Sequence, residues 1–550
     1  MPQLQINQGP QDALLYDNTR SYFTNVGYVR TSNFQVEYKT VDSQNNAAWG
    51  STMQFIIPKA ADLLGPCDLR VTIPAPTANG ITVDASGTGL ETSRVYSQWV
   101  DELGFAMIEK ITFSVGSNDI ETLTGEELQI RNELMTSDEM RLGFESIQKT
   151  GRRAFNVPAS LTGTNASAVT TNELPGKGLN KNVQQDYTRL IALSYATTNG
   201  TTVTTRGPLE AEDRTLIIPL GLFFTKHVSQ YFPLAAVAGC NDIRISIKLR
   251  QLDSLIQLGG VLDTSETKIQ SIAKPTIGNP SKFELFCHYV HVTGPEAQTL
   301  MNKEHVRLLK MYQHQTETFT NISSKMDLNL SFLHPVSTLI ITIRAEADLN
   351  DKVTGQSGAG LVDNDVQGKG FFFYHGDGTN PNYDRLCEVV RTSVTDSNFK
   401  QGTCKVDSIQ LTLNGQERHP SLNKGIDIDY LRTRLLPTLH SNSDSTQRQM
   451  YGSATTSSIE QAYGMHGSKN ILVYPFSLNP EGSNPSGAVN FSKVSHAKLT
   501  INLDPAWTAA CANEASTTMP KATNGFRVDV YALYYNWLQI KDGRALLSFA

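Results

Sequence analysis

The sequence predicts an all-β protein built from two copies of one antiparallel β-domain. Three observations lead to this prediction: strict alternation of apolar and polar residues in several short stretches, little helical periodicity, and four pairs of similar segments in the same order in both halves. Alternation with period two places one set of side chains on a core and the other towards solvent. Many short strands separated by Gly, Asn and Pro turns are typical of a sandwich or a barrel.

The alternation predicts individual strands. It is clearest in three stretches, which are 243–249, 409–413 and 499–503. The second of them ends in Asn414-Gly415, a dipeptide typical of a two-residue hairpin turn. Helical periodicity is confined mainly to Glu126–Met135, with a weaker signal around Glu296–His305. We therefore expect few and short helices.

Four segments of the first half have counterparts in the second half. The pairs are 111–120 with 409–418, 216–224 with 471–478, 242–249 with 496–503, and 283–292 with 526–535. Chance would rarely place four pairs of similar segments in the same order in both halves of a chain. The chain is therefore expected to hold two copies of one β-domain, with a hinge near 294–304.

The spacing of these segments predicts where the two copies differ. From 111 to 216 the first copy spans 105 residues, whereas the second copy spans 62 residues from 409 to 471. The extra residues fall around 145–207, a stretch rich in Thr, Asn, Ser and Gly that predicts a long exposed loop. Comparable loops of the second copy are 351–384 and 438–470. Long polar loops on a rigid β-scaffold are where surface recognition usually resides.

Length, composition and charge exclude several classes of protein. A chain of 550 residues is too long for one hydrophobic core. With 39% hydrophobic and 18% charged residues, it is expected to fold rather than to stay disordered. The net charge of −6 argues against a protein that coats nucleic acid, which would carry a basic stripe.

The cysteines and the N-terminus indicate synthesis in a reducing cytosol. No CxxC pair occurs, and the spacing predicts neither a disulfide framework nor a zinc site for Cys67, Cys240, Cys287, Cys387, Cys404 and Cys511. Cys287 lies in an apolar stretch and is expected in the core. The first residues do not resemble a secretory signal, and no apolar run approaches the roughly 18 residues of a membrane span. The sequons at Asn165 and Asn321 are therefore interpreted as chance matches.

The sequence lacks the common short motifs of enzymes and of metal sites. The sequence contains no phosphate-binding GxxxxGK[ST] loop, no HExxH and no GxSxG elbow. His288 and His291 could suggest metal ligands, but their spacing on a strand points the rings to opposite faces, which favours ordinary packing. The adjacent carboxylates of Asp101-Glu102 and Asp138-Glu139 are more often solvated than catalytic. The sequence therefore predicts a protein that is not an enzyme, with no catalytic, cofactor-binding or metal-binding residues.

The C-terminal aromatic residues and a glycine-rich stretch could each suggest a binding site, but both are better interpreted as structural. The aromatic residues near the C-terminus could stack on bases or sugars, namely Tyr531, Tyr534, Tyr535 and Trp537. Alternation through Phe526, Val528, Val530, Ala532 and Tyr534 makes packing in the core the better interpretation. The stretch Gly355–Gly360 is expected to be a flexible loop and not a phosphate cradle, because no Lys follows it.

Several short motifs, taken in order, resemble one family of proteins. Gly9-Pro-Gln-Asp12 is similar to an opening Gly-Ala-Gln-Asp, and the later motifs lie at 22–34, Gly125–Leu134, His334-Pro-Val336, Tyr474–Ser492 and Val530–Leu538. The order resembles the double jelly-roll major capsid proteins of nucleocytoplasmic large DNA viruses over nearly the whole chain. The strongest stretch is Tyr474–Ser492, with an apolar strand, a Pro-Glu turn and a Pro-Ser-Gly-x-x-Asn-Phe-Ser segment.

The resemblance implies two tandem eight-stranded antiparallel jelly rolls with long surface loops and a few short helices. The expected parts are an N-terminal arm at 1–24, a first jelly roll at 25–294 with its long loop at about 145–207, a hinge at 295–304, and a second jelly roll at 305–550. The arm is expected to reach neighbours or minor capsid proteins. The long loops are expected to form an outer tower and the contacts that lock a trimer.

The resemblance also implies a function. Three chains would form a homotrimer of pseudo-hexagonal outline, and such trimers would tile the facets of a large icosahedral virion shell. The partners would be neighbouring trimers and minor capsid proteins beneath the shell, with glycans as candidates on the outer loops and no direct contact with nucleic acid. Two alternatives stay open: a minor capsid or spike protein of such a virus, and a carbohydrate-binding β-sandwich protein with paired carboxylates and exposed aromatic residues.

Overall fold

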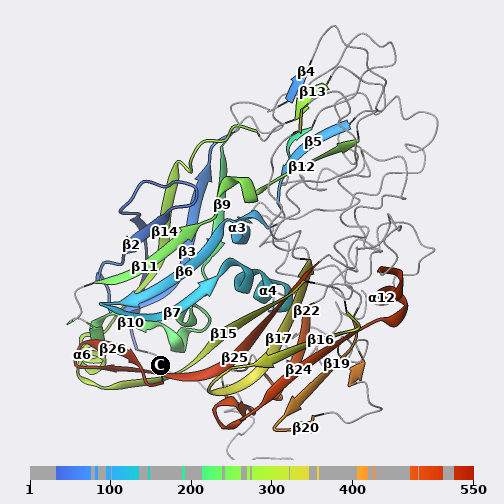
Figure 1. Ribbon diagram of the computed structural model, residues 1–550. Coiled ribbons are helices and arrows are strands. Elements are labelled where there is room, and N and C mark those ends of the chain that lie inside the picture. Colours follow the sequence, from blue (N-terminus) through green and yellow to red (C-terminus); the bar gives the residue numbers. More distant parts are fainter. Residues whose placement is uncertain are drawn as a thin grey trace, which may run out of the picture.

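The chain folds into two antiparallel β-sandwiches that repeat one strand order (Figure 1). We call β1–β14 the first unit and β15–β26 the second. The computed structural model describes residues 32–75, 81–83, 94–100, 102–135, 147–148, 189–192, 213–237, 239, 242–261, 269–272, 275–320, 323–345, 356–357, 406–418, 425–427, 431, 471–480, 482, 484–511 and 525–549.

The first unit consists of two facing sheets. One sheet has the order β1-β14-β3-β10, with β9 also paired to β3. Its strands are β1 (Phe34–Asp42), β14 (Lys282–Val292), β3 (Leu63–Ile73), β10 (Phe232–Pro233) and β9 (Arg214–Pro219). The other sheet has the order β2-β11-β6-β7, with β2 (Thr52–Ile56), β11 (Ile243–Leu249), β6 (Ile108–Val115) and β7 (Asn118–Thr124).

The second unit repeats this arrangement. Its first sheet has the order β15-β25-β17-β22, with β15 (His305–Phe319), β25 (Phe526–Lys541), β17 (Pro335–Ala345), β22 (Ile471–Pro475), and the short β23 (Val489–Asn490) and β26 (Arg544–Leu547) beside them. Its second sheet has the order β16-β24-β19-β20, with β16 (Lys325–Leu330), β24 (Ala497–Leu503), β19 (Val406–Leu413), β20 (Gln416–Glu417) and β21 (Ile426–Asp427).

The four segment pairs of the sequence occupy corresponding places in the two units. They fall on β6 and β19, β9 and β22, β11 and β24, and β14 and β25. In the first unit β1 pairs with β14 and β2 with β11, and in the second unit β15 pairs with β25 and β16 with β24. Early strands thus pair with late ones in the same way in both units, as in a jelly roll. The predicted fold class is therefore confirmed. In the described part of the chain the sheets hold five and four strands, then six and five, because short strands extend the eight expected in each unit.

The core explains why these stretches form strands. Along β11 buried Ile and Leu alternate with half-buried polar residues, as predicted. Four phenylalanines of the first unit pack ring against ring between the sheets: Phe113, Phe223, Phe224 and Phe232. The turn at Asn414-Gly415 has φ values of 51° and 79° and joins β19 to β20, as expected for a two-residue hairpin.

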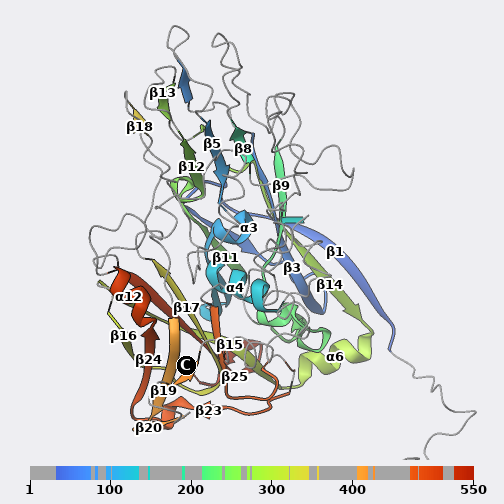
Figure 2. The same cartoon turned by 90° about the vertical axis from the view of Figure 1, so that its right-hand side faces the viewer.

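In the part of the chain that the structure describes, several short helices lie outside the sheets. The two predicted ones are present as α4 (Gly125–Met135) and α6 (Gly294–Asn302), and α6 lies between β14 and β15. The sequence did not predict α3 (Leu103–Ala106) or α12 (Pro505–Cys511), which are too short for a periodic pattern. In Figures 1 and 2, α4 lies between the two sandwiches.

Two small sheets extend from one end of the first unit (Figure 2). They have the orders β12-β5-β8 and β18-β13-β4, with β12 (Ile256–Val261), β5 (Arg94–Trp99), β8 (Arg189–Ala192), β18 (Gln356–Ser357), β13 (Ile269–Ile272) and β4 (Ile81–Val83). Only β8 belongs to the predicted loop at 145–207, most of which lies outside the described residues. The flexible loop predicted at Gly355–Gly360 is corrected in part, because β18 pairs its backbone with β13.

The described residues do not include the N-terminal arm 1–24 or the predicted loops 351–384 and 438–470, apart from β18. They also leave out Asn165 and Asn321. Cys67 and Cys287 are buried free thiols placed opposite each other on β3 and β14, so the expected core position of Cys287 is confirmed.

Candidate functional site

The helix α4 begins with a reciprocal cap. The backbone N–H of Thr124 donates to Glu127 Oε2 at 2.9 Å, and the N–H of Glu127 donates to Thr124 Oγ1 at 3.2 Å. Burial raises the pKa of Glu127 to about 7. At Gly125 a Cβ would lie 2.2 Å from the carbonyl oxygen of Phe105 and 2.3 Å from that of Ile108. Only glycine therefore lets the helix begin this close to the backbone of Phe105 and Ile108.

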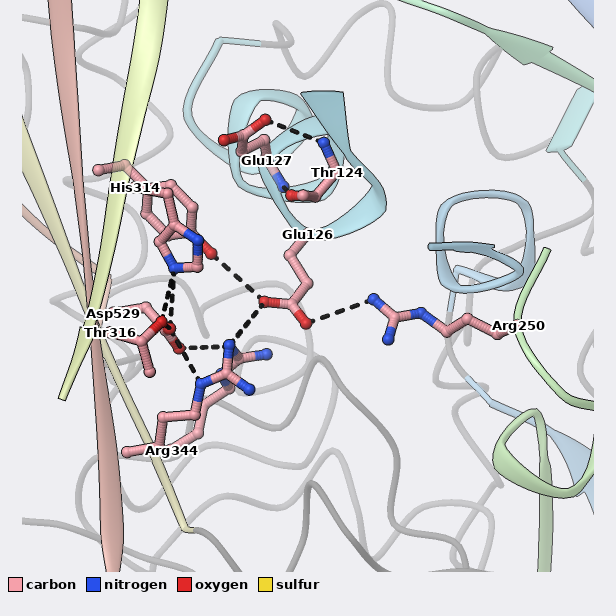
Figure 3. A network of polar contacts seen from close by, with 10 residues as sticks. Thr124, Glu126, Glu127, Arg250, His314, Thr316, Arg344 and Asp529 are labelled. Atoms are coloured by element: carbon pink, nitrogen blue, oxygen red, sulfur yellow. Dashed lines mark hydrogen bonds and ion pairs between the residues drawn. The ribbon is translucent and has the colours of Figure 1, made fainter. Parts of the chain in front are cut away.

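The next residue, Glu126, reaches from α4 to the second unit (Figure 3). Its Oε2 accepts a hydrogen bond from Arg344 Nη2 of β17 at 2.8 Å and one from the Tyr531 hydroxyl of β25 at 3.3 Å. Its Oε1 lies 3.3 Å from Arg250 Nη2, which follows β11 of the first unit. One carboxylate thus joins both units.

Asp529 of β25 completes the network. Its Oδ2 lies 2.5 Å from Arg344 Nη2, so this guanidinium bridges two carboxylates. Its Oδ1 accepts hydrogen bonds from Thr316 Oγ1 at 2.7 Å and from Arg527 Nε at 3.0 Å, and lies 2.9 Å from His314 Nε2 (Figure 3). The Arg344 side chain is 1% exposed and that of Asp529 is 0% exposed. Charges buried to this degree are tolerated only when they are paired.

The network keeps both acids ionised. Burial would raise the pKa of Glu126, but the charges of Arg344 and Arg250 outweigh it and lower this pKa to about 2. Burial acts in the same way on Asp529, where the hydrogen bond from His314 and the charge of Arg344 hold the pKa well below its usual range. These carboxylates are therefore fixed anions that are unsuited to donating or accepting a proton near neutral pH.

Apolar side chains surround the network. Ile130 and Leu134 of α4 pack against Ile340 of β17, Val473 of β22 and Tyr531 of β25. The His314 ring stacks on Tyr531 with centroids 4.4 Å apart. The helix thus covers the outer face of a sheet in the second unit, and the charges fix where on this face it lies.

The two histidines singled out in the sequence make ordinary contacts. The His288 ring stacks on Tyr38 with centroids 4.9 Å apart, and His291 Nε2 lies 3.1 Å from Glu37 Oε2. Across the described ranges, no group of three or more His, Cys, Asp or Glu side chains is arranged to bind a metal ion. None of the helices described there is long and apolar enough to cross a membrane.

The paired carboxylates of the sequence are only partly described. Glu102 precedes α3 in a left-handed conformation with φ of 49°, whereas Asp101, Asp138 and Glu139 lie outside the described residues. The structure brings none of the described candidates together into one site.

The aromatic residues near the C-terminus divide into two groups. Tyr531, Tyr534 and Tyr535 are buried, whereas Trp537 is 42% exposed. Core packing is confirmed for the tyrosines. The sequence predicted one buried face on this strand, but both faces are buried from Val528 to Asn536, because α4 covers the outer one near Tyr531.

Sequence reasoning missed the network itself. A signal was available, because Asp529 stands between Val528 and Val530 and Arg344 follows Ile343, and charges are almost never fully buried unless they are paired. The sequence could not show that their common partner, Glu126, lies on a helix of the other unit.

Two family models match the chain. Residues 21–293 match the one described as "Major capsid protein N-terminus", and residues 454–545 match "Large eukaryotic DNA virus major capsid protein". The matches lie in order on the two units. The chain belongs to the double jelly-roll major capsid proteins of large DNA viruses.

Individual relatives of this capsid family are distant in sequence, and the matches cover from about two thirds to nearly all of their length. The major capsid protein of Phaeocystis pouchetii virus is 22% identical, over 98% of each chain. That of Paramecium bursaria Chlorella virus 1 is 23% identical, over 60% of this chain and 66% of its own. The family that the motifs suggested is thus confirmed.

Solved capsid structures share the fold. A chain of the PBCV-1 virus capsid superposes with a TM-score of 0.56 at 16% identity, covering 96% of this chain and all of the other. The Faustovirus major capsid protein gives a TM-score of 0.56 at 13% identity, covering 97% and 94%. At such identities the likeness concerns the fold alone.

Proposed function

We propose that this chain is the main structural subunit of the icosahedral shell of a large DNA virus and acts without an enzymatic reaction. The observation that carries the proposal is the repetition of one jelly-roll unit within a chain of this family. The relative from Phaeocystis pouchetii virus, which matches both units, is a major capsid protein. The place of action is the virion capsid, after synthesis in the host cytoplasm.

The proposed assembly is a homotrimer. Three chains with two similar units each present six similar bodies around one axis, which gives a near-hexagonal outline suited to tiling a flat facet. Heterologous contacts close such a ring when the rotation between neighbours fits, and weaker contacts between trimers then close the shell. The net charge of −6 is small for 550 residues, so general repulsion between copies is modest.

In this assembly the buried network has the task of holding the two units in one relative position. A buried ion pair is weak as a source of stability but well suited to fixing register, because any shift leaves a charge unpaired. Glu126 of the first unit is hydrogen-bonded to both Arg344 and Tyr531 of the second. A rigid pair of units would let every chain present the same angle to its neighbours.

The parts of the chain are proposed to serve different contacts. The arm at 1–24 reaches neighbours or minor capsid proteins, the jelly rolls at 25–294 and 305–550 form the wall, and 295–304 joins them. The loop at about 145–207 forms the outer tower and locks the trimer, and the outer loops are candidate sites for glycans. Contact with the genome is not proposed, since the chain is acidic overall.

Microscopy of the purified protein tests this function. Negative-stain images of the recombinant chain should show trimers with a hexagonal outline, whereas a uniform population of monomers would contradict the proposal. Gel densitometry of purified virions should find this chain as the most abundant protein; a low copy number would favour a minor capsid or spike protein. If a variant that lacks 160–205 still forms stable trimers in light scattering, the locking role is wrong.

A further inference from the structure

Two buried cysteines face each other in the first unit. Cys67 of β3 and Cys287 of β14 are direct register partners in neighbouring antiparallel strands, although they lie far apart in the sequence. Both are free thiols, and the two residues are 1% and 0% exposed. Direct partners of an antiparallel pair lie on the same face of the sheet. The two side chains therefore point together into the core of the first unit.

The strand register sets a separation that suits a disulfide bond. Opposed residues of antiparallel strands have Cα atoms about 4.5 or about 5.5 Å apart, depending on their place in the ladder. A disulfide bond spans Cα distances of about 4.4–6.8 Å, so either place allows the bond without a shift of the backbone. The thiols already interact, because a hydrogen bond with Cys287 and burial raise the pKa of Cys67.

The ladder between the two strands is irregular directly beside the cysteines. The register shifts there, so that Gly65 and Pro66 of β3 lie opposite His288 of β14 alone. Such a β-bulge leaves one residue unpaired and disrupts the ladder locally. Pro66 also has no N–H to donate. Local opening at this bulge is therefore expected to admit a small oxidant to the sulfur atoms, slowly and without unfolding of the unit.

We propose that Cys67 and Cys287 are an oxidation site, at which a peroxide converts the two thiols into a disulfide bond in the folded chain. One thiol attacks hydrogen peroxide and becomes a sulfenic acid, and one water molecule is released. The other thiol then attacks the sulfenic sulfur, so that the S–S bond forms and a second water molecule leaves. The two thiols together lose two electrons and two protons, and the peroxide is reduced to water.

The bond would close a loop that spans most of the first unit. From residue 67 to residue 287 the chain advances 220 residues. A cross-link stabilises a protein mainly by restricting the unfolded chain, and more strongly when the closed loop is long. The bond would also fasten β14 to β3 beside the bulge. The oxidised protein should therefore resist unfolding better than the reduced protein.

The state of the two cysteines would follow the surroundings of the chain. A reducing cytosol keeps thiols free, whereas disulfide bonds persist in oxidising surroundings outside the cell. Under the proposed function the chain is made in the host cytoplasm and leaves it in a virion, so the bond would form late. This timing rests on the proposed function, whereas the oxidation site itself does not.

Peptide mapping under non-reducing conditions tests the site. The full chain, reduced and folded, is incubated with hydrogen peroxide, alkylated and digested. Mass spectrometry should find the peptides of Cys67 and Cys287 joined and two hydrogens lighter than their sum, while both free thiols decrease together. Thiols that stay reduced in the folded chain would overturn the inference, and so would sulfinic acid at either residue or a preferred bond to another cysteine.

Urea unfolding tests whether the bond fits the fold. The midpoint of the oxidised wild type should lie roughly 1 M above that of the reduced protein, and a reductant should abolish the difference. An equal or lower midpoint would overturn the inference. In Cys287→Ala, peroxide should leave the midpoint unchanged and give no linked peptide; Cys67→Ala is the reciprocal variant if this one does not fold. Cys404→Ala keeps both thiols and should behave like the wild type.

The outcomes separate the two proposals. A monomeric chain that forms the linked peptide supports the inference and contradicts the trimer, whereas trimers whose two thiols resist peroxide contradict the inference alone. Purified virions should contain the linked peptide, while newly made protein in infected cells should contain the free thiols. Virions with both thiols free would contradict the late formation of the bond.

Discussion

Replacing Arg344 by Met should be far more harmful than the same change at Arg70. The two arginines point outwards from corresponding strands, β17 and β3, and by register face Arg527 and Glu284 on the neighbouring strands. The Arg344 side chain is 1% exposed and bridges two carboxylates, whereas that of Arg70 is 45% exposed and lies 3.9 Å from one. The pair therefore compares a buried ion pair with an exposed one at the same place in the fold.

The magnitude follows from the burial. Breaking a buried ion pair costs about 3–5 kcal/mol, because the remaining charge is left without compensation. After Arg344→Met, Glu126 keeps Arg250 and Asp529 keeps Arg527, so the loss should lie near about 3 kcal/mol. Arg70→Met removes an exposed pair, which contributes about 0–1 kcal/mol.

Urea unfolding at pH 7, followed by tryptophan fluorescence, measures the free energy of unfolding of both variants. Adding Glu126→Gln to Arg344→Met should recover part of the loss, because one unpaired charge disappears, and the double-mutant cycle gives the coupling. Equal losses for Arg344→Met and Arg70→Met would refute the reasoning, as would a buried variant as stable as the wild type.

Three further predictions concern the helix caps and the core. Burial raises the pKa of Glu127 from 4.5 to about 7, so its contribution to stability is present at low pH and is lost as the pH rises to about 7. The urea midpoint of the wild type should therefore fall between pH 5 and pH 8. The variant Glu127→Gln should flatten this fall. Gly125→Ala should cost about 3 kcal/mol in calorimetry, since its Cβ would meet two carbonyl oxygens, while Gly294→Ala, with nothing within 4 Å, should change stability by less than about 1 kcal/mol. In native protein, mass spectrometry should find Cys67 and Cys287 protected from a thiol reagent, because both are buried and the pKa of Cys67 is raised; labelling at the rate of urea-unfolded protein would contradict this.

The sequence predicted those parts of the fold that depend on a single buried face. Alternation placed β11, β19 and β24 correctly, because their inward residues face the core whatever covers the molecule elsewhere. Duplication of four segments then predicted corresponding strands, and all four pairs lie at corresponding sheet positions.

The rest depends on contacts between distant residues. Alternation cannot show what covers the second face of β25, so the link between Tyr531 and Glu126 could not be foreseen. The small sheets that contain β4, β5, β12 and β13 pair strands of only three to six residues that lie far apart in the chain. Strands this short carry too little alternation to predict their partners.

Pairing of the first strand with the last also sets an order for folding during synthesis. Phe34 pairs with Val292, so the β1-β14-β3-β10 sheet of the first unit cannot form completely until the ribosome has released β14. Such non-local pairing makes folding slow. The contact of Glu126 of α4 with Tyr531 forms later still, because nearly the whole chain must have emerged from the ribosome before the two residues can meet. Until then the Glu126 carboxylate stays hydrated. Its desolvation is therefore a late step of folding that occurs when the two units pack against each other.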